Sequence, residues 1–223
     1  MISGTEDQPE EVFRHAPGGG EMNTDIRKSI ILKNSRGSEA AFEIRRCSEK
    51  DCGEIMLLQD EVASLIADKE MFAITTEDEI TESLALDFCA GVYDDDRLVA
   101  FTLMIIPRIT PRNLAVHFNV SREELLKSVT FDASFVHPGS RGYGMQNLFL
   151  DLRCEEALRL GAGAAYATVS PKNTASLRNL TSSGFKCAAS KVLYGGKQRY
   201  IMRKELIKED IPGGTVYGSR NLS

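Results

Sequence analysis

A strand-like run that leads into a glycine loop and then a helix is the feature that most constrains this fold. In ASFVHPGSRGYGMQNLF, residues 133–149, an apolar run stops at Pro138 and a helical pattern follows two glycines. After the helix comes AAYATVS, a short and largely apolar segment of the kind found in buried parallel strands. This order predicts a parallel βαβ unit, which requires a sheet with helices packed on it.

Further helices are marked by their N-terminal caps. A Ser or Thr followed three residues later by an acidic residue satisfies the free N–H groups at a helix start. Such pairs are Ser48 with Asp51, Thr76 with Glu79, and Ser121 with Glu124. The last pair predicts a short helix from residue 122 to about 127, and the glycine loop is followed by a helix over about 143–160. One face of the helix after Ser48 is expected to be buried, namely Ile55, Leu58, Val62, Leu65 and Ile66.

Two hairpins complete the pattern. The first joins FCAGVY to LVAFTLMII through Asp94, Asp95 and Asp96, whose side chains support turns and need no bound cation. The second joins SKVLY to KQRYIMRKEL, and Gly195-Gly196 suits a two-residue type I′ turn between them. Hairpins and a βαβ unit together predict an α/β (mixed) fold, a twisted mixed sheet of about seven strands with helices on both faces.

The organised body is predicted to span residues 42–206. Residues 1–41 are interpreted as a flexible N-terminal arm, because they are largely polar and contain the break PGGG at 17–20. Within that arm the segment SIILK fits either a short strand or a helix. Residues 207–223, which include IPGGTVYGSRNLS, are interpreted as a C-terminal tail.

Composition excludes several functional classes. The net charge of −5 argues against a nucleic-acid binder, whose surface would gather Lys and Arg. No run approaches the roughly 20 apolar residues of a membrane span, and the N-terminus lacks the apolar core of a signal peptide, so a cytoplasmic location is expected. The cysteines are irregularly spaced, which favours reduced thiols over a zinc site, and no metal is expected. They are Cys47, Cys52, Cys89, Cys154 and Cys187.

The glycine loop has the chemistry of an anion site. Free N–H groups at a helix start point outward, and glycines let a ligand approach the backbone closely. Three phosphate motifs nevertheless fail here. YGGKQ at 194–198 lacks the Ser or Thr of a P-loop, Asn147 stands where a dinucleotide fingerprint needs its third glycine, and the elements of a kinase are missing.

The full context resembles the GCN5-related N-acetyltransferases, the GNAT superfamily. VHPGSRGYGMQ is similar to their coenzyme-A signature, which is Arg or Gln, two residues, Gly, one residue, then Gly or Ala. Arg141 and Gly144 match, Gly142 is a common extra glycine, and Gln146 departs from the pattern. A second block, NTASLRNLTSSGF, matches at Asn173, at Ser176 and in its Gly-Phe ending. The resemblance covers residues 42–206, about three-quarters of the chain.

The resemblance implies an N-acetyltransferase that moves acetyl from acetyl-CoA to a primary amine, on a small molecule or a peptide, by direct attack in a ternary complex. A splayed pair of parallel strands would hold the CoA. The pyrophosphate would lie on the N–H groups of Arg141, Gly142, Tyr143, Gly144, Met145 and Gln146. Phe135, Val136 and His137 would lie beside the acetyl end, and Asn173 and Ser176 would contact the pantetheine arm or the nearby end of CoA.

Two residues are candidates for catalysis under this resemblance. The N–H of Val136 would polarise the thioester carbonyl. Asp132 lies on the same strand, where simple alternation puts it on the face of Ser134 and Val136, and it is the candidate general base, directly or through water. An ion-paired or solvent-facing carboxylate is the equal alternative for Asp132. His137 precedes Pro138 and is interpreted as a structural residue at a strand end.

The family's usual proton donor is missing. Many relatives place a tyrosine seven residues after the asparagine, where this chain has Leu180. Either Tyr194, Tyr143 or Ser183 replaces it, or the thiolate leaves unassisted, which the thiol pKa of roughly 8–9 favours.

An insertion over residues 107–128 is predicted to wall the amine site, with Arg108, Arg112 and His117 as contacts. The alternative function is a non-catalytic acyl-CoA-binding or sensing module, motivated by Leu180 and Gln146. The assembly state stays open, with a homodimer as one alternative.

Overall fold

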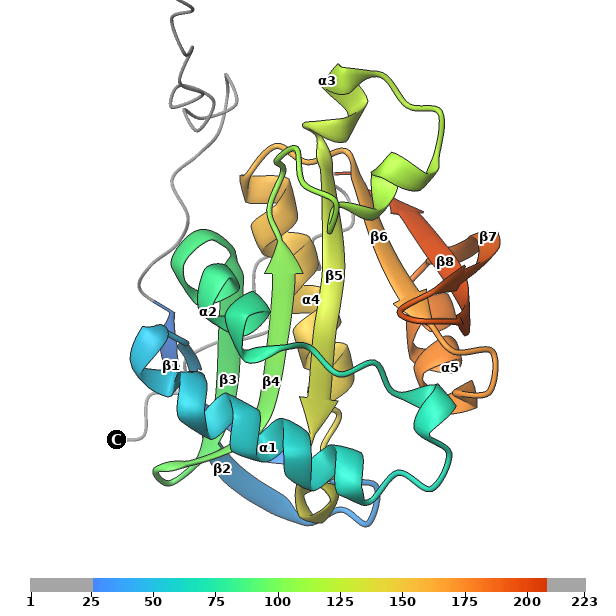
Figure 1. Cartoon of the computed structure of the whole chain (residues 1–223). Coiled ribbons are helices and arrows are strands. Elements are labelled where there is room, and N and C mark those ends of the chain that lie inside the picture. Colours follow the sequence, from blue (N-terminus) through green and yellow to red (C-terminus); the bar gives the residue numbers. More distant parts are fainter. Residues whose placement is uncertain (1–25, 208–223) are drawn as a thin grey trace, which may run out of the picture.

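A computed structural model describes residues 26–207, which form one eight-stranded mixed sheet with helices on both faces (Figure 1). The strand order is β1-β2-β3-β4-β5-β6-β8-β7, and β5 with β6 is the parallel pair. The strands are β1 (Arg27–Lys33), β2 (Glu39–Arg46), β3 (Phe88–Asp94), β4 (Arg97–Ile105), β5 (Ser128–Val136), β6 (Ala164–Val169), β7 (Lys186–Leu193) and β8 (Lys197–Glu205). The predicted fold class is confirmed, with one strand more than expected.

The additional strand is β1, so the prediction of a flexible arm is wrong from Arg27 onward. β1 pairs antiparallel with β2, and Ile30 lies opposite Phe42 in the register. Both side chains are buried in the main core. Only one side chain of β1 is buried, so its sequence carries little periodicity from which a strand could be predicted. Residues 1–25 of the predicted arm, and the tail from residue 208, lie outside the described residues.

The helices form two layers. In Figure 1, α1 and α2 lie in front of the sheet, α4 and α5 lie behind it, and α3 stands at one end. The helices are α1 (Cys52–Ser64), α2 (Glu77–Leu86), α3 (Arg122–Leu125), α4 (Met145–Arg159) and α5 (Thr174–Ser182). Within the described residues, the connections between these elements contain 3-10 turns: η1 (Glu49–Asp51), η2 (Lys69–Met71), η3 (Leu114–His117) and η4 (Pro138–Ser140). Across residues 26–207, none of the helices has the length and apolar character that spanning a bilayer requires.

The predicted capping boxes are confirmed, and several helix bounds differ from their predictions by a few residues. All three capping boxes form, those of Ser48, Thr76 and Ser121. Helix α3 ends at Leu125, earlier than predicted, and Leu65 follows the end of α1 with 65% of its surface exposed. Helix α4 begins at Met145, because Gly144 has a φ of 74° that no right-handed helix accepts.

The β7–β8 hairpin differs from its prediction. Leu193 pairs with Lys197, so the loop contains three residues and is not a two-residue type I′ turn. All three have positive φ: Tyr194 at 49°, Gly195 at 72° and Gly196 at 103°. A tyrosine in this region is uncommon, because its Cβ approaches the following carbonyl oxygen. The loop thereby presents the Tyr194 side chain toward the splayed strands that are described below.

A buried ion pair fixes the start of the insertion after β4. Asp87, which is fully buried, accepts hydrogen bonds from the backbone of Ile106 and from the Arg108 guanidinium, at 2.9 Å for the shortest. Removal of one partner from a buried ion pair leaves the other uncompensated, at a cost of about 3–5 kcal/mol.

We therefore expect Asp87→Ala to lower the free energy of unfolding by about 3 kcal/mol. Glu123→Ala is the control, since Glu123 pairs with Lys127 at 77% and 58% side-chain exposure. Exposed pairs of this kind contribute below about 1 kcal/mol. Urea unfolding of both variants measures the difference, and similar losses would contradict a special role for Asp87.

Candidate functional site

The site is built where two parallel strands separate. β5 pairs with β6 only over its first half, where Ser128 to Phe131 face Ala164 to Ala167. From Asp132 to Val136, β5 keeps β4 as its neighbour, and no pairing with β6 remains. The N–H and C=O groups on this edge of β5 are thus available to a ligand lying between the strands.

A β-bulge decides which side chains enter the gap. Thr102 pairs with Ser134 and Met104 with Phe131, so Leu103 alone faces Asp132 and Ala133. These two consecutive residues therefore lie on one face, which is a usual effect of a bulge. The prediction that Asp132 shares a face with Ser134 and Val136 is wrong for this reason.

The contacts on the two faces agree with that register. Asp132 turns toward α2 and the insertion, through Arg112. Ser134 instead donates a hydrogen bond of 2.9 Å to Gln146 of α4, and Val136 packs in the core beneath that helix. Phe135 belongs to the core on the α1 and α2 face, together with the partly buried Ala133.

The N–H of Val136 points into the gap. His137 donates its own N–H to the carbonyl oxygen of Val99 in β4, at 2.8 Å. Successive N–H groups of a strand alternate between its two edges. The N–H of Val136 is therefore directed away from β4, toward the space that β6 vacates.

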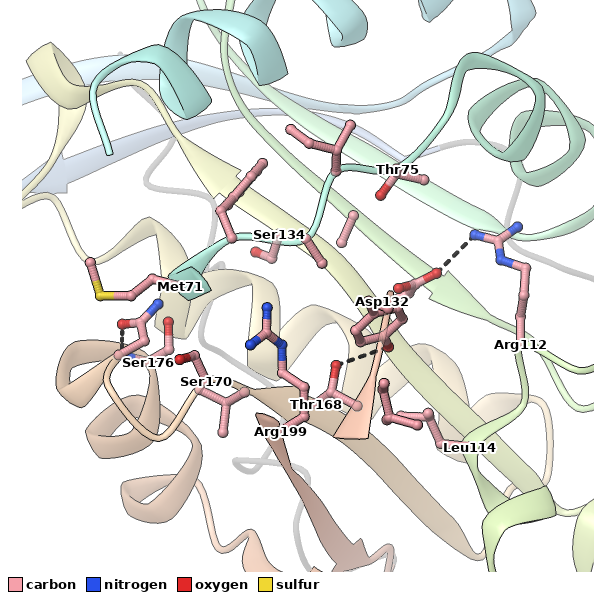
Figure 2. A pocket seen from close by; sticks show the side chains of 18 of the residues that line it. Met71, Thr75, Arg112, Leu114, Asp132, Ser134, Thr168, Ser170, Ser176 and Arg199 are labelled. Atoms are coloured by element: carbon pink, nitrogen blue, oxygen red, sulfur yellow. Dashed lines mark hydrogen bonds and ion pairs between the residues drawn. The ribbon is translucent and has the colours of Figure 1, made fainter. Parts of the chain in front are cut away.

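A cavity of about 320 Å³ opens on the α2 side of this gap (Figure 2). Its walls come from the segment after η2, the insertion, the split strands, the start of α5 and the β7–β8 hairpin. Four of the predicted catalytic and CoA-binding residues line it: Asp132, Phe135, Asn173 and Ser176. Val136, His137 and residues 141–146 lie outside this lining.

Asp132 is ion-paired at the edge of the cavity. Arg112 Nη2 donates to Asp132 Oδ2 at 2.8 Å, and a quarter of the Asp132 side chain remains exposed. Burial raises the pKa of the Asp132 carboxyl, while the Arg112 charge and hydrogen bond lower it. The ion-paired alternative is therefore what the structure shows, and the carboxylate still faces the cavity.

The glycine loop leaves a run of donors unused. η4 and Gly144 use the N–H groups of Ser140, Arg141, Asn147 and Leu148. Between them, the N–H groups of residues 142–146 have no acceptor within the described part of the chain. Gly142 and Gly144 both adopt positive φ, 90° and 74°, and only glycine does this without strain. An anion at the start of α4 would supply the missing acceptors.

Asn173 and His137 are committed to local structure. Asn173 Oδ1 accepts the N–H of Ser176 at 3.0 Å and caps α5. His137 Nδ1 accepts the N–H of Gly139 at 3.1 Å, and its Nε2 lies 3.5 Å from Glu61 and 3.3 Å from Arg97. Its ring therefore joins the loop to α1 and the start of β4, outside the cavity lining.

Of the three hydroxyl groups considered as replacements for the tyrosine missing at Leu180, one lines the cavity. Leu180 is 8% exposed and packs in the core. Tyr143 packs against Phe42, with ring centroids 5.3 Å apart, and Ser183 ends α5 outside the cavity. Tyr194 does line the cavity, and its hydroxyl lies 3.0 Å from Thr168 Oγ1.

Part of the insertion forms a wall of the cavity, and its predicted role at the amine site stays a prediction. Arg112 and His117 line it, whereas Arg108 is held by Asp87. Asn113, fully buried, fixes the wall: its Nδ2 donates to the carbonyl oxygens of Arg108 and Leu125 at 3.1 Å.

Sequence reasoning missed two parts of the cavity. The segment from Met71 to Thr75 lies across it, held by the buried Gln59, which exchanges two hydrogen bonds with the Thr75 backbone. Arg199 of β8 points into it from the opposite side (Figure 2). Neither has a local sequence signal, because each depends on contacts between distant elements.

No protein-family model and no curated protein sequence matches this chain, whereas solved structures match its fold. A putative acetyltransferase from Salmonella typhimurium, solved with its cofactor acetyl-CoA, is 20% identical, and the match covers 75% of this chain and 95% of that one, with a TM-score of 0.56. An acetyltransferase of the GNAT family from Streptococcus pneumoniae is 15% identical over 74% and 99% of the two chains, with a TM-score of 0.56.

A third match is the ribosomal-protein-S18-alanine N-acetyltransferase from Escherichia coli, which is 13% identical over 82% and 99%, with a TM-score of 0.56. The chain thus has the fold of the GNAT acetyltransferases, and the resemblance drawn from the glycine loop is confirmed at the level of architecture. Within residues 26–207 there is no cluster of three His, Cys, Asp or Glu side chains that could hold a metal.

Proposed function

We propose that this chain transfers acetyl from acetyl-CoA to a primary amine, with both substrates bound together. The observation that carries this proposal is the run of N–H groups from 142 to 146, which lack acceptors at the end of a strand that has left its parallel neighbour. An anion at the helix start and an extended chain in the gap would satisfy both sets of backbone groups. Acetyl-CoA carries both, a pyrophosphate and a pantetheine arm with amide groups.

The CoA-binding residues follow from this placement. The pyrophosphate would accept hydrogen bonds from the N–H groups of residues 142–146. The N–H of Arg141, predicted to join them, is bonded to Pro138 instead, so Arg141 would contribute its positive charge at the surface. Pantetheine would run along β5, past Ser134 and toward Asn173 and Ser176. Gln146 departs from the family signature, but its side chain accepts the hydrogen bond from Ser134 and so joins the loop to β5.

The reactive thioester would lie where the cavity meets the gap. There the N–H of Val136 would donate to the carbonyl oxygen as negative charge develops on it. The amine nitrogen attacks the carbonyl carbon, the new C–N bond forms, and the C–S bond breaks. The amine arrives mostly protonated, so a base must remove a proton before or during attack.

Asp132 is the proposed base, directly or through one water molecule. It is the carboxylate that lies on the unpaired part of β5 and faces the cavity. Burial raises its pKa, which suits proton acceptance, and Arg112 limits that rise. The departing thiolate needs no acid from the protein, because a thiol pKa of roughly 8–9 makes it an adequate leaving group.

A non-catalytic acyl-CoA-binding module is the second candidate, supported by the burial of Leu180 at the usual tyrosine position. Thiol release from acetyl-CoA with a panel of primary amines separates the two. Turnover with any amine supports the transferase, whereas tight acetyl-CoA binding without turnover of any amine supports the module. The cytoplasmic location and a homodimer stay predictions.

The first prediction concerns the pyrophosphate site. Gly144→Val should raise the acetyl-CoA dissociation constant at least tenfold, because a side chain there blocks close approach to the backbone. Gly161→Val is the matched control: Gly161 follows α4, has φ 77° against 74°, and a Cβ meets nothing within 4 Å at either glycine. Both variants should lose about 1–2 kcal/mol of stability from left-handed strain.

Calorimetric titration with acetyl-CoA and thermal melting measure the two effects separately. An unchanged dissociation constant for Gly144→Val, at the same loss of stability as the control, would remove the glycine loop from the binding site.

The second prediction concerns the base. Asp132→Asn should lower kcat by about 10²–10⁴-fold and abolish the acidic limb of the pH–rate profile. Arg112→Gln should move that limb to higher pH, because the guanidinium lowers the pKa of Asp132. Stopped-assay thiol release from pH 5 to 9 measures both, and an unchanged profile in Asp132→Asn shows that another group accepts the proton.

A further inference from the structure

Arg199 is a buried cation without a matching anion. Its residue surface is only 3% exposed, and its Nη1 donates to the carbonyl oxygen of Gln198 at 2.9 Å. Its Nη2 has no hydrogen-bond partner, and the side chain forms no ion pair with any residue in the range 26–207. Burial of a charge without hydrogen bonds is costly, so a group that completes this site would bind favourably.

The guanidinium is aimed at the cavity. Arg199 lines it, and Figure 2 shows the side chain rising from β8 into the space below Ser134, across from the segment that contains Met71. Ile201, two residues further along β8, packs beneath Leu114 of the insertion. The Arg199 side chain is therefore on the same side of the sheet as the insertion and Asp132, and on the opposite side from α4.

The other charges that line the cavity already have partners. Arg112 is paired with Asp132, and the Glu79 carboxylate accepts the N–H and the hydroxyl of Thr76 in a capping box. Burial lowers the pKa of His117, and Lys191 lowers it further, so this imidazole is neutral near pH 7. Among the described lining residues, Arg199 is thus the cation that still needs an anion.

The charges of Arg199 and Asp132 both act on the hydroxyl of Tyr194. The Arg199 guanidinium carbon lies 5.9 Å from the centre of the Tyr194 ring. Burial raises the pKa of the Tyr194 hydroxyl, the Asp132 charge raises it further, and the Arg199 charge lowers it. Both charges are therefore close to the Tyr194 hydroxyl, which is hydrogen-bonded to Thr168.

We propose that Arg199 binds a carboxylate of the acceptor, so that the acceptor is a small molecule with a primary amine and a carboxylate, as in an amino acid. This inference rests on the proposed acetyl transfer and names the substrate class for it. The amine lies toward Asp132 and the thioester, and the carboxylate lies on the Nη2 edge of Arg199.

A carboxylate fits better than a phosphate or an unsubstituted amine. One free guanidinium balances one negative charge, and the carboxylates of Asp132 and Glu79 would repel a doubly charged phosphate in the same cavity. A plain monoamine or polyamine would leave Arg199 buried without an anion. The cavity of about 320 Å³ also suits a small molecule more than a polypeptide segment.

The test compares matched acceptors on the whole chain. Thiol release from acetyl-CoA is measured with each of several amino acids, with its α-carboxamide, which keeps the amine and loses the charge, and with its decarboxylated amine. Loss of one hydrogen bond to a charged group should reduce kcat/KM by roughly 10- to 100-fold for the two uncharged series. Peptides with a free N-terminus form a separate series.

Arg199→Gln should reduce the preference for the carboxylate below about 3-fold and leave the KM for acetyl-CoA unchanged, while Arg199→Lys should retain part of it. Arg203→Gln is the control, because Arg203 lies four residues further along the same strand, bonds Tyr166 and Glu205, and does not line the cavity. The control should keep the full preference. Thermal melting checks that all three variants fold.

The outcomes separate the two proposals. Equal turnover of amino acids and their carboxamides, or turnover confined to the peptides, overturns this inference and leaves acetyl transfer intact. If the wild-type protein neither turns over any acceptor nor binds acetyl-CoA, the proposed function itself is overturned. If acetyl-CoA binds without turnover, amino acids are titrated against the CoA complex. Binding that Arg199→Gln weakens supports the carboxylate site, and absence of binding overturns it.

Discussion

The separation of β5 from β6 is the constraint on which the rest of the site depends. A parallel pair normally satisfies backbone groups along its whole length, yet here only the first four residues of β5 pair with β6. The remaining groups on that edge must be satisfied by something else, and no strand within residues 26–207 does so. The helix that follows adds acceptorless N–H groups at the same end. Binding capacity therefore arises from backbone that the fold leaves incomplete, more than from any special side chain.

The parts that could be predicted from the sequence are those set by neighbouring residues. Capping boxes and left-handed glycines depend on contacts within a few positions of the chain. Single residues such as Thr76 and Gly144 therefore already indicate them, and the same holds for the end of the strand before Pro138. The bulge at Asp132 depends on the register with β4, and simple alternation put that side chain on the wrong face. The SIILK segment of β1 could not be assigned and Arg199 was missed for the same reason. The pairing of β1 and the position of Arg199 in the cavity wall both depend on the assembled sheet.

The two charged side chains on either side of the cavity differ in how their charges are balanced. Asp132 has Arg112 as a partner, so its charge is held in place, and the loss of Arg112 would leave the Asp132 carboxylate without this compensation. Arg199 forms no ion pair within residues 26–207, and burial lowers its pKa, although the charges of Tyr194 and Glu70 act in the opposite direction. An unpaired buried cation lowers the stability of a protein. Its presence here is consistent with a role in binding an anion.

The cavity walls are fixed before any ligand arrives, and this decides how selectivity can arise. Asn113 and Gln59 are both buried, and each joins two separate backbone segments through its amide group. Lys197 also donates to the carbonyl oxygen of Phe72 and holds the segment after η2 against the β7–β8 hairpin. Walls held by satisfied buried hydrogen bonds do not reshape cheaply for different acceptors. Discrimination must therefore come from groups already in place, and a preorganised Arg199 rejects an uncharged acceptor because its own charge then stays unpaired.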